Sequence, residues 1–317
     1  MASPNNENPA LRMMAEGNLT EAVEALTQSL RLNEDIFGRV SAETAEDNRN
    51  LGVVHFRRMD MEASLIHFSR ALEIDQQLYG NNDPQVAVDF SNLANAQREL
   101  GEFDKAVKSI KNTLRIDRKV YGESSRETAA AYSSLGGILF HMNEFAEAEK
   151  AFEKALKIQM AVFGAVHEEC AITLSSLGNI KEARREYQAA QTLYEQALSI
   201  AVQAIGKQHR YIASLLNLLG NVRMYNNDLP GAADAFKQGL EIDQAAYPAQ
   251  PHPSIARDLN NLGVVYEKQA AYQQAIEKYS ASLEILKQLF TEYHPNVKGA
   301  RENLQRVQHH LSSHEQK

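Results

Sequence analysis

The sequence predicts an all-α fold in which antiparallel helix pairs stack along the chain. Three observations predict it: a repeat period of 42 or 43 residues, apolar columns that keep this period, and helical spacing within each unit. The period shows in a Leu followed by a small residue, at Leu51-Gly52, Leu93-Ala94, Leu135-Gly136, Leu177-Gly178, Leu219-Gly220 and Leu262-Gly263. Because each unit of such an array buries its apolar face only against its neighbours, 317 residues need not divide into ordinary globular domains.

Two further columns lie on the second helix of each unit. A small residue follows the Leu by thirteen positions and a bulky residue by seventeen, which is the i, i+4 spacing of one helix face. The small column is Ser64, Ala106, Ala148, Ala190, Ala232 and Ala275, and the bulky column is Phe68, Ile110, Phe152, Tyr194, Phe236 and Tyr279. We expect the small residue beside the Leu to lie where the two helices cross, because a larger side chain there would push the backbones apart.

Turn signals separate the helices. A bulky residue and Gly end the second helix at Phe37-Gly38, Tyr79-Gly80, Tyr121-Gly122, Phe163-Gly164 and Ile205-Gly206. Gly suits the positive φ of a helix C-cap, and Pro suits the first turn of the helix that follows. Pro occurs there at Asp83-Pro84, His252-Pro253 and His294-Pro295. Turn-forming residues such as Gly101 and Asn227 mark the short turn inside a helix pair.

These Leu-Gly and Ala-x-x-x-Phe/Tyr columns resemble the tetratricopeptide repeat, whose usual period is about 34 residues. The longer period and the Tyr/Phe-Gly ends resemble the kinesin light chain type. The resemblance implies a right-handed superhelix whose first helices line a concave groove, in which Asn and basic residues hold extended cargo peptides. Kinesin light chains also carry a heptad region that binds the motor, and no sustained heptads occur here. We therefore expect either a relative that binds peptides without the motor or a fragment.

The repeat columns divide the chain into five parts. We expect a flexible N-terminus at 1–8, a partial repeat at 9–42, six repeats at 43–296, a capping helix at 297–311 and a flexible tail at 312–317.

Composition excludes several classes of function. The net charge of −8 argues against nucleic acid as a partner, and no apolar run approaches the roughly 18 residues that span a bilayer. The N-terminus does not resemble a secretory signal, and the one cysteine, Cys170, fits a reducing, cytoplasmic setting. No phosphate loop, nucleophile motif or metal-ligand spacing occurs, so we expect no cofactor, no metal and no enzyme activity.

Polar side chains recur on the face of the first helices that should line the groove, two before, one before, two after and five after the Leu. We assign the peptide groove to Arg49, Asn50, Ser91, Asn92, Asn95, Arg98, Ser133, Ser134, Phe140, Ser175, Asn179, Asn217, Asn221, Asn260 and Asn261. Asn inside a helix costs several tenths of a kcal/mol relative to Ala, so its recurrence needs a reason. A carboxamide offers a donor and an acceptor to a peptide backbone. Alternatively, these side chains hydrogen-bond to neighbouring helices or are exposed to solvent.

The favoured function is a protein-interaction scaffold that binds an extended peptide of a partner protein. Basic residues such as Arg98 favour acidic peptides in the N-terminal half, whereas Glu182 and Glu267 make this preference doubtful in the C-terminal half. The alternative is a structural or regulatory solenoid, including a homodimer formed through the partial repeat, where Met13 and Met14 could be exposed.

Overall fold

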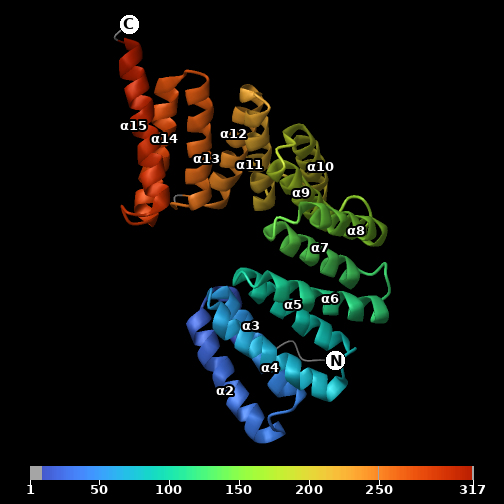
Figure 1. The fold of residues 1–317 in the computed structure, drawn as a ribbon. Coiled ribbons are helices and arrows are strands. Elements are labelled where there is room, and N and C mark those ends of the chain that lie inside the picture. Colours follow the sequence, from blue (N-terminus) through green and yellow to red (C-terminus); the bar gives the residue numbers. More distant parts are fainter. Residues whose placement is uncertain (1–8, 249, 316–317) are drawn as a thin grey trace. The chain divides into compact units, whose positions relative to one another are not determined.

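The computed structural model describes residues 9–248 and 250–315, so the segment 1–8 and the last two residues of the predicted tail lie outside the described part. All regular secondary structure in the described part is α-helical (Figure 1). The chain divides into two compact units, Met1–Val162 and Phe163–Lys317, which are taken in turn.

The first unit holds four helix pairs. Their bounds are α1 Pro9–Glu16, α2 Leu19–Phe37, α3 Ala42–Arg57, α4 Met61–Tyr79, α5 Pro84–Glu99, α6 Phe103–Val120, α7 Arg126–His141 and α8 Phe145–Phe163, the last of which ends at the boundary. The helices of the pairs α1–α2, α3–α4 and α5–α6 contact each other, and α4 contacts α5 as α6 contacts α7. In the fourth pair, Gly136 of α7 lies against Phe152 of α8. The first helices α5 and α7 of successive repeats also touch.

The second unit continues the same pattern. Its helices are α9 Glu168–Ala183, α10 Tyr187–Ile205, α11 Arg210–Tyr225, α12 Leu229–Ala246, α13 Pro253–Lys268, α14 Tyr272–Leu289 and α15 Pro295–Glu315. The capping helix α15 is longer than the predicted 297–311 at both ends. It begins at a Pro, which suits the first turn, and neither Gly nor Pro follows Leu311 to stop it.

Glycine at the position after the Leu is required by an aromatic ring of the same repeat. A Cβ atom added at Gly178 would lie 2.4 Å from the Tyr194 ring, and at Gly52 it would lie 2.5 Å from the Phe68 ring. Gly136, Gly220 and Gly263 lie against Phe152, Phe236 and Tyr279 in the same way. The prediction that a small residue lies at the helix crossing is confirmed. The repeat with Ala94 instead of Gly is also the repeat with Ile110 instead of a ring, and both are fully buried in one cluster.

Residues with positive φ end the helices. Gly38, Gly80, Gly122, Gly164 and Gly206 follow second helices with φ between 80 and 90°, as predicted. Inside the helix pairs the same kind of conformation falls on Gly101 (φ 75°) and on non-glycine residues, which are Met59, Asn143, Arg185, Asn227 and Ala270, with φ of 57–62°. The sequence therefore signals these turns poorly, because residues other than Gly and Asn rarely adopt positive φ and yet occupy most of these positions.

The partial repeat is packed on its apolar side. Met14 is buried in a cluster with Ala22, Leu26 and Leu51, and Met13 is half-buried against it. The expectation that these methionines are exposed is therefore wrong, because α2 and α3 cover them.

Candidate peptide-binding groove

An amide-lined pocket lies on the first helices of the first unit. It is a cavity of about 350 Å³ whose walls are Val53 and Phe56 of α3, Phe68 of α4, and Asn92, Asn95 and Arg98 of α5. Three of these six residues belong to the predicted groove. The apolar walls and the two carboxamides thus come from consecutive repeats, and we call this cavity the amide pocket.

The carboxamides of the amide pocket are free. Asn92 and Asn95 are half-buried, and neither side chain has a hydrogen-bond partner among the described residues. In α3, one repeat earlier, Asn50 occupies the same position as Asn92, and its Nδ2 is buried without a partner. Buried amide groups are normally hydrogen-bonded, so Asn50 is unusual in a folded chain, whereas Asn92 and Asn95 are half-buried.

Arg98 supplies the positive charge at this pocket. Its Nη2 lies 2.6 Å from Oε1 of Glu99, the next residue in the chain. Both side chains are partly exposed, and such pairs typically contribute 0–1 kcal/mol. An acidic group of a ligand can therefore replace Glu99 at little cost.

Arg49, which the sequence also assigns to the groove, makes two ion pairs inside the protein. Its Nη2 lies 2.5 Å from Oδ2 of Asp75 and its Nε lies 2.8 Å from Oδ1 of Asp89, so it joins α3 to α4 and α5. Burial raises the pKa of Asp89 to about 7 although Arg49 lowers it, and the neighbouring Asp75 raises it further. The cation is needed inside the protein, because two buried carboxylates without it would repel each other.

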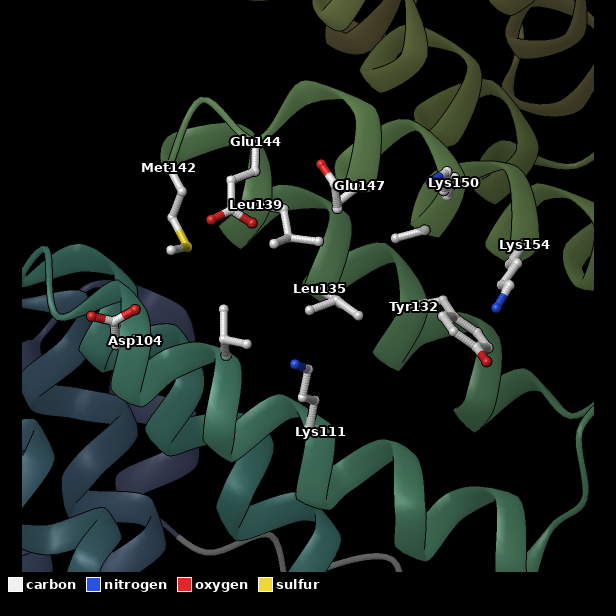
Figure 2. A pocket seen from close by; sticks show the side chains of 12 residues that line it. Asp104, Lys111, Tyr132, Leu135, Leu139, Met142, Glu144, Glu147, Lys150 and Lys154 are labelled. Carbon is white, nitrogen blue, oxygen red and sulfur yellow. The ribbon is translucent and has the colours of Figure 1, made fainter.

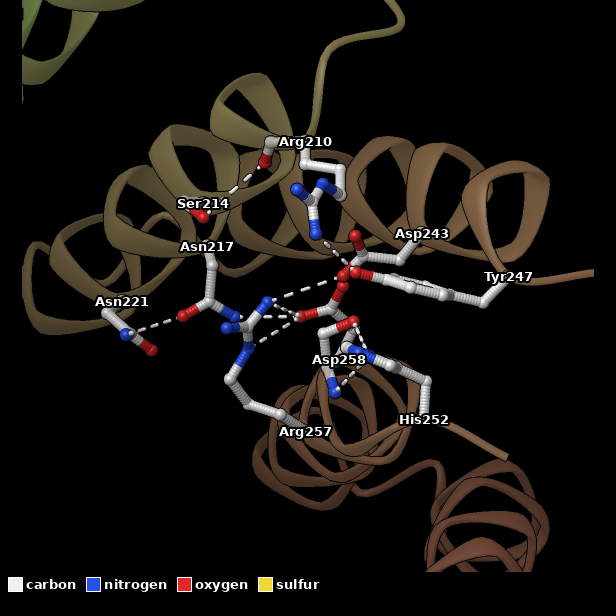
Figure 3. Close-up of polar contacts among 10 residues, drawn as sticks. Arg210, Ser214, Asn217, Asn221, Asp243, Tyr247, His252, Arg257 and Asp258 are labelled. Carbon is white, nitrogen blue, oxygen red and sulfur yellow. Dashed lines mark hydrogen bonds and ion pairs between the residues drawn. The ribbon is translucent and has the colours of Figure 1, made fainter. Parts of the chain in front are cut away.

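Asn217 has the corresponding role in the second unit (Figure 3). Its Nδ2 donates to Oδ1 of Asp258 over 3.0 Å, and Nη2 of Arg257 lies 3.0 Å from the same oxygen. Arg257 Nη2 also lies 3.6 Å from Oδ2 of Asp243. Burial raises the pKa of Asp258 to about 6 against the opposing effect of Arg257. Asn217, which the sequence assigns to the groove, thus has a partner inside the protein, and Nδ2 of Asn221 lies 3.5 Å from its Oδ1.

Other predicted positions in the second unit also have internal partners. The Tyr194 hydroxyl lies 2.7 Å from Oδ1 of Asn179 and 2.8 Å from Oε2 of Glu182. The Tyr279 hydroxyl donates to Oε2 of Glu267 over 2.8 Å. Burial is the main cause that raises the pKa of both tyrosines above the usual range, so they stay protonated donors. The hydrogen bond from Tyr194 leaves the negative charge of Glu182 in place, whereas Glu267 is also paired with Arg306, whose Nη2 lies 2.8 Å from its Oε2.

Some of the remaining predicted residues contact other side chains of the protein, and others make no side-chain hydrogen bond in the described part of the chain. Ser175 is buried, and its Oγ lies 3.0 Å from the Tyr211 hydroxyl, so it too is internal. Ser133 accepts a hydrogen bond from Gln159 over 3.4 Å, and the ring of Phe140 lies 5.6 Å from that of Phe145. Asn260 accepts from Asn303 of α15 over 3.0 Å at the wall of a cavity of about 300 Å³. Among the described residues no side-chain hydrogen bond is made by three half-buried members of the set, which are Ser91, Ser134 and Asn261.

The described part of the chain contains no group of three or more His, Cys, Asp or Glu side chains that could hold a metal ion. None of its helices is long and apolar enough to cross a bilayer.

Comparison with known proteins identifies the helix pairs as repeats of a known family. A family model described as tetratricopeptide repeat matches residues 43–119, 90–161, 127–201 and 169–245, and a second with the same description matches 217–288. No curated protein matches the chain by sequence.

Several solved structures have a similar fold. BtubC (BKLC) from P. vanneervenii is 23% identical, with a TM-score of 0.62 over 74% of this chain and 94% of that chain. TPR-like repeats from Podosopora anserina, described as kinesin light chain, are 20% identical, with a TM-score of 0.57 over 66% of this chain and 99% of that chain. The apo form of RapI is 18% identical, with a TM-score of 0.61 over 89% and 96%. The chain belongs to the tetratricopeptide repeat family, and the solved structures that resemble it include kinesin light chain-like repeats.

Proposed function

We propose that the chain is a scaffold that binds an extended peptide of a partner protein at the amide pocket of its first unit. Tetratricopeptide repeat solenoids are in general protein-interaction scaffolds, and fold alone does not choose the site. The observation that carries the choice is the pair Asn92 and Asn95, whose carboxamides have no hydrogen-bond partner in the described part of the chain.

The chemistry of the pocket suits an extended peptide. Each carboxamide donates to a peptide C=O and accepts from a peptide N–H, so the two amides hold backbone that has no partner of its own. The cavity of about 350 Å³ between Val53, Phe56 and Phe68 takes one large apolar side chain of that peptide. Arg98 pairs with an acidic residue beside it. The preferred ligand is therefore an extended peptide in which a large apolar or aromatic residue is flanked by acidic residues.

The second unit contributes less to this proposal. Ser175, Asn179 and Asn217 bind other side chains of the chain itself, so a ligand there would have to break existing hydrogen bonds. An unmade hydrogen bond in a buried site costs roughly 1–3 kcal/mol.

Selection from a library of random peptides on the intact chain would supply a ligand, whose affinity is then measured by fluorescence anisotropy. Asn92→Ala combined with Asn95→Ala should weaken binding at least tenfold, since each lost amide contributes about 1 kcal/mol. The control combines Asn81→Ala with Asn112→Ala, two side chains of the same unit that lie outside the pocket and have no side-chain partner among the described residues. Equal affinity for both double variants, with folding intact, would remove the groove assignment.

A further inference from the structure

A larger cavity lies on the opposite side of the first helices. It measures about 450 Å³, and its floor is the face of α7 that carries Leu135 and Leu139, between the second helices α6 and α8 (Figure 2). Ser133 and Gly137, which belong to the groove columns, lie on the other side of α7, because helix positions two residues apart point about 200° apart. This second-helix cavity is therefore separate from the peptide groove.

The charged residues around the second-helix cavity are sorted along its length. Asp104, Glu144 and Glu147 lie toward the end where α6 and α8 begin, next to Met142. The lysines lie toward the other end, next to Tyr132, and they are Lys111, Lys150 and Lys154. The cavity thus has an apolar floor, an acidic end and a basic end.

Most of these charges have no partner in the protein. Within residues 9–248 and 250–315, none of Asp104, Lys111, Glu144, Glu147 and Lys150 makes an ion pair or a side-chain hydrogen bond. The ammonium group of Lys154 lies 5.3 Å from the centre of the Tyr132 ring, which holds it at the basic end. The acidic residues at helix N-termini are favourable to the α6 and α8 dipoles, but the lysines, which lie in the middle of α6 and α8, have no such role.

We propose that the second-helix cavity binds an amphipathic α-helix of a partner protein, with acidic residues in its first turn and basic residues in its last turn. The floor from Tyr132 of α7 to Met142, the residue after this helix, corresponds to ten helical rises or about 15 Å, which is the length of about three helical turns. Helices commonly have this charge order because it suits the helix dipole. When such a helix lies antiparallel to α6 and α8, its acidic first turn meets the basic end of the cavity and its basic last turn meets the acidic end. Its apolar stripe then covers Leu135 and Leu139, as in other helix-in-groove complexes.

A designed helical peptide of about three turns tests the proposal on the full chain. The probe has Glu in the first turn, Leu at i, i+3 and i+7, and Lys in the last turn. Two comparison peptides have the same composition, one with Glu and Lys exchanged and one with a central Pro that prevents the helix. The probe should bind the chain at least tenfold more tightly than either comparison peptide.

Charge reversal of the cavity locates the site. Lys111→Glu with Lys150→Glu should weaken binding of the probe about tenfold, which is about 1.4 kcal/mol. The matched control, Lys108→Glu with Lys157→Glu, reverses exposed charges on the same two helices outside the cavity and should leave binding unchanged. Asn92→Ala with Asn95→Ala should also leave it unchanged, so this result is independent of the peptide groove. The proposal is overturned if the probe does not bind, if all three peptides bind equally, or if the two charge reversals have equal effects.

Discussion

Gly178 lies beneath the ring of Tyr194, so closely that a Cβ atom on Gly178 would be 2.4 Å from a ring carbon. The ring cannot move away freely, because Tyr194 is fully buried and its hydroxyl bonds to Asn179 and Glu182. The contact recurs in the other repeats that have Gly at this position. It is the physical basis of the Leu-Gly column from which the repeat period is read.

Gly178→Ala is therefore expected to lower the free energy of unfolding of the second unit by about 1–3 kcal/mol, the usual range for overpacking. Urea denaturation followed by circular dichroism measures the change. Gly299→Ala is the control, because a Cβ atom at Gly299 of α15 meets nothing within 4 Å and Ala is the better helix former. It should raise stability by several tenths of a kcal/mol. A loss of stability in Gly299→Ala as large as in Gly178→Ala would contradict this explanation.

Ala270 sits in a left-handed conformation, with φ of 57°, in the turn between α13 and α14. Replacing it with Gly removes the clash of Cβ with the backbone, so Ala270→Gly should raise the free energy of unfolding by about 0.5–1 kcal/mol. Thermal unfolding measures this as an increase in Tm. Ala183→Gly, at an exposed position of α9 without positive φ, relieves no strain and should lower Tm because Gly is the poorer helix former. A higher Tm for Ala183→Gly than for Ala270→Gly would exclude backbone strain as the cause.

The buried carboxylate pair of the first unit predicts a pH dependence of stability. Burial raises the pKa of Asp89 to about 7, above the value of about 4 expected in the unfolded chain. Between these two values the folded state binds more protons at Asp89 than the unfolded state, so the contribution of Asp89 to stability is fully present below pH ~4 and is lost as pH rises through 7. Asp89→Asn should remove that part of the decline.

Urea denaturation of both proteins at pH 5 and pH 7.5 separates this contribution from that of other acids. Asp117 titrates in the same direction, since burial raises its pKa to about 6, and it remains in both proteins. The wild type should lose about 1 kcal/mol or more beyond the loss of Asp89→Asn over this interval. Equal losses would show that Asp89 is ionised throughout.

Much of the fold could be predicted from the sequence because its determinants recur at one period. The Leu, Gly and aromatic columns placed the helix pairs, and the Gly after each second helix has the positive φ that was predicted. The turns with Met59, Arg185 and Ala270 carry no such signal. These residues adopt positive φ although none of them is Gly or Asn.

The candidate site was predicted only in part. Asn92, Asn95 and Arg98 lie together at the amide pocket, whereas Arg49 and Asn217 bind carboxylates of the following repeat. Periodicity identifies a helix face but does not tell which of its positions the next repeat covers.

The second-helix cavity was missed for a related reason. Its charges come from α6 and from the start and middle of α8, and on each helix alone they are indistinguishable from an ordinary solvent-facing surface.

The most direct test of the central claim observes the side-chain amide groups of Asn92 and Asn95 during ligand binding. Nuclear magnetic resonance of the ¹⁵N-labelled chain, with these NH₂ signals assigned through the single Asn→Ala variants, follows a titration with the selected acidic-aromatic peptide. Both pairs of signals should shift in proportion to the bound fraction, with the signal of Asn112 as an unaffected reference. Saturating peptide that leaves the Asn92 and Asn95 signals unmoved would contradict the assignment of the amide pocket as the peptide site.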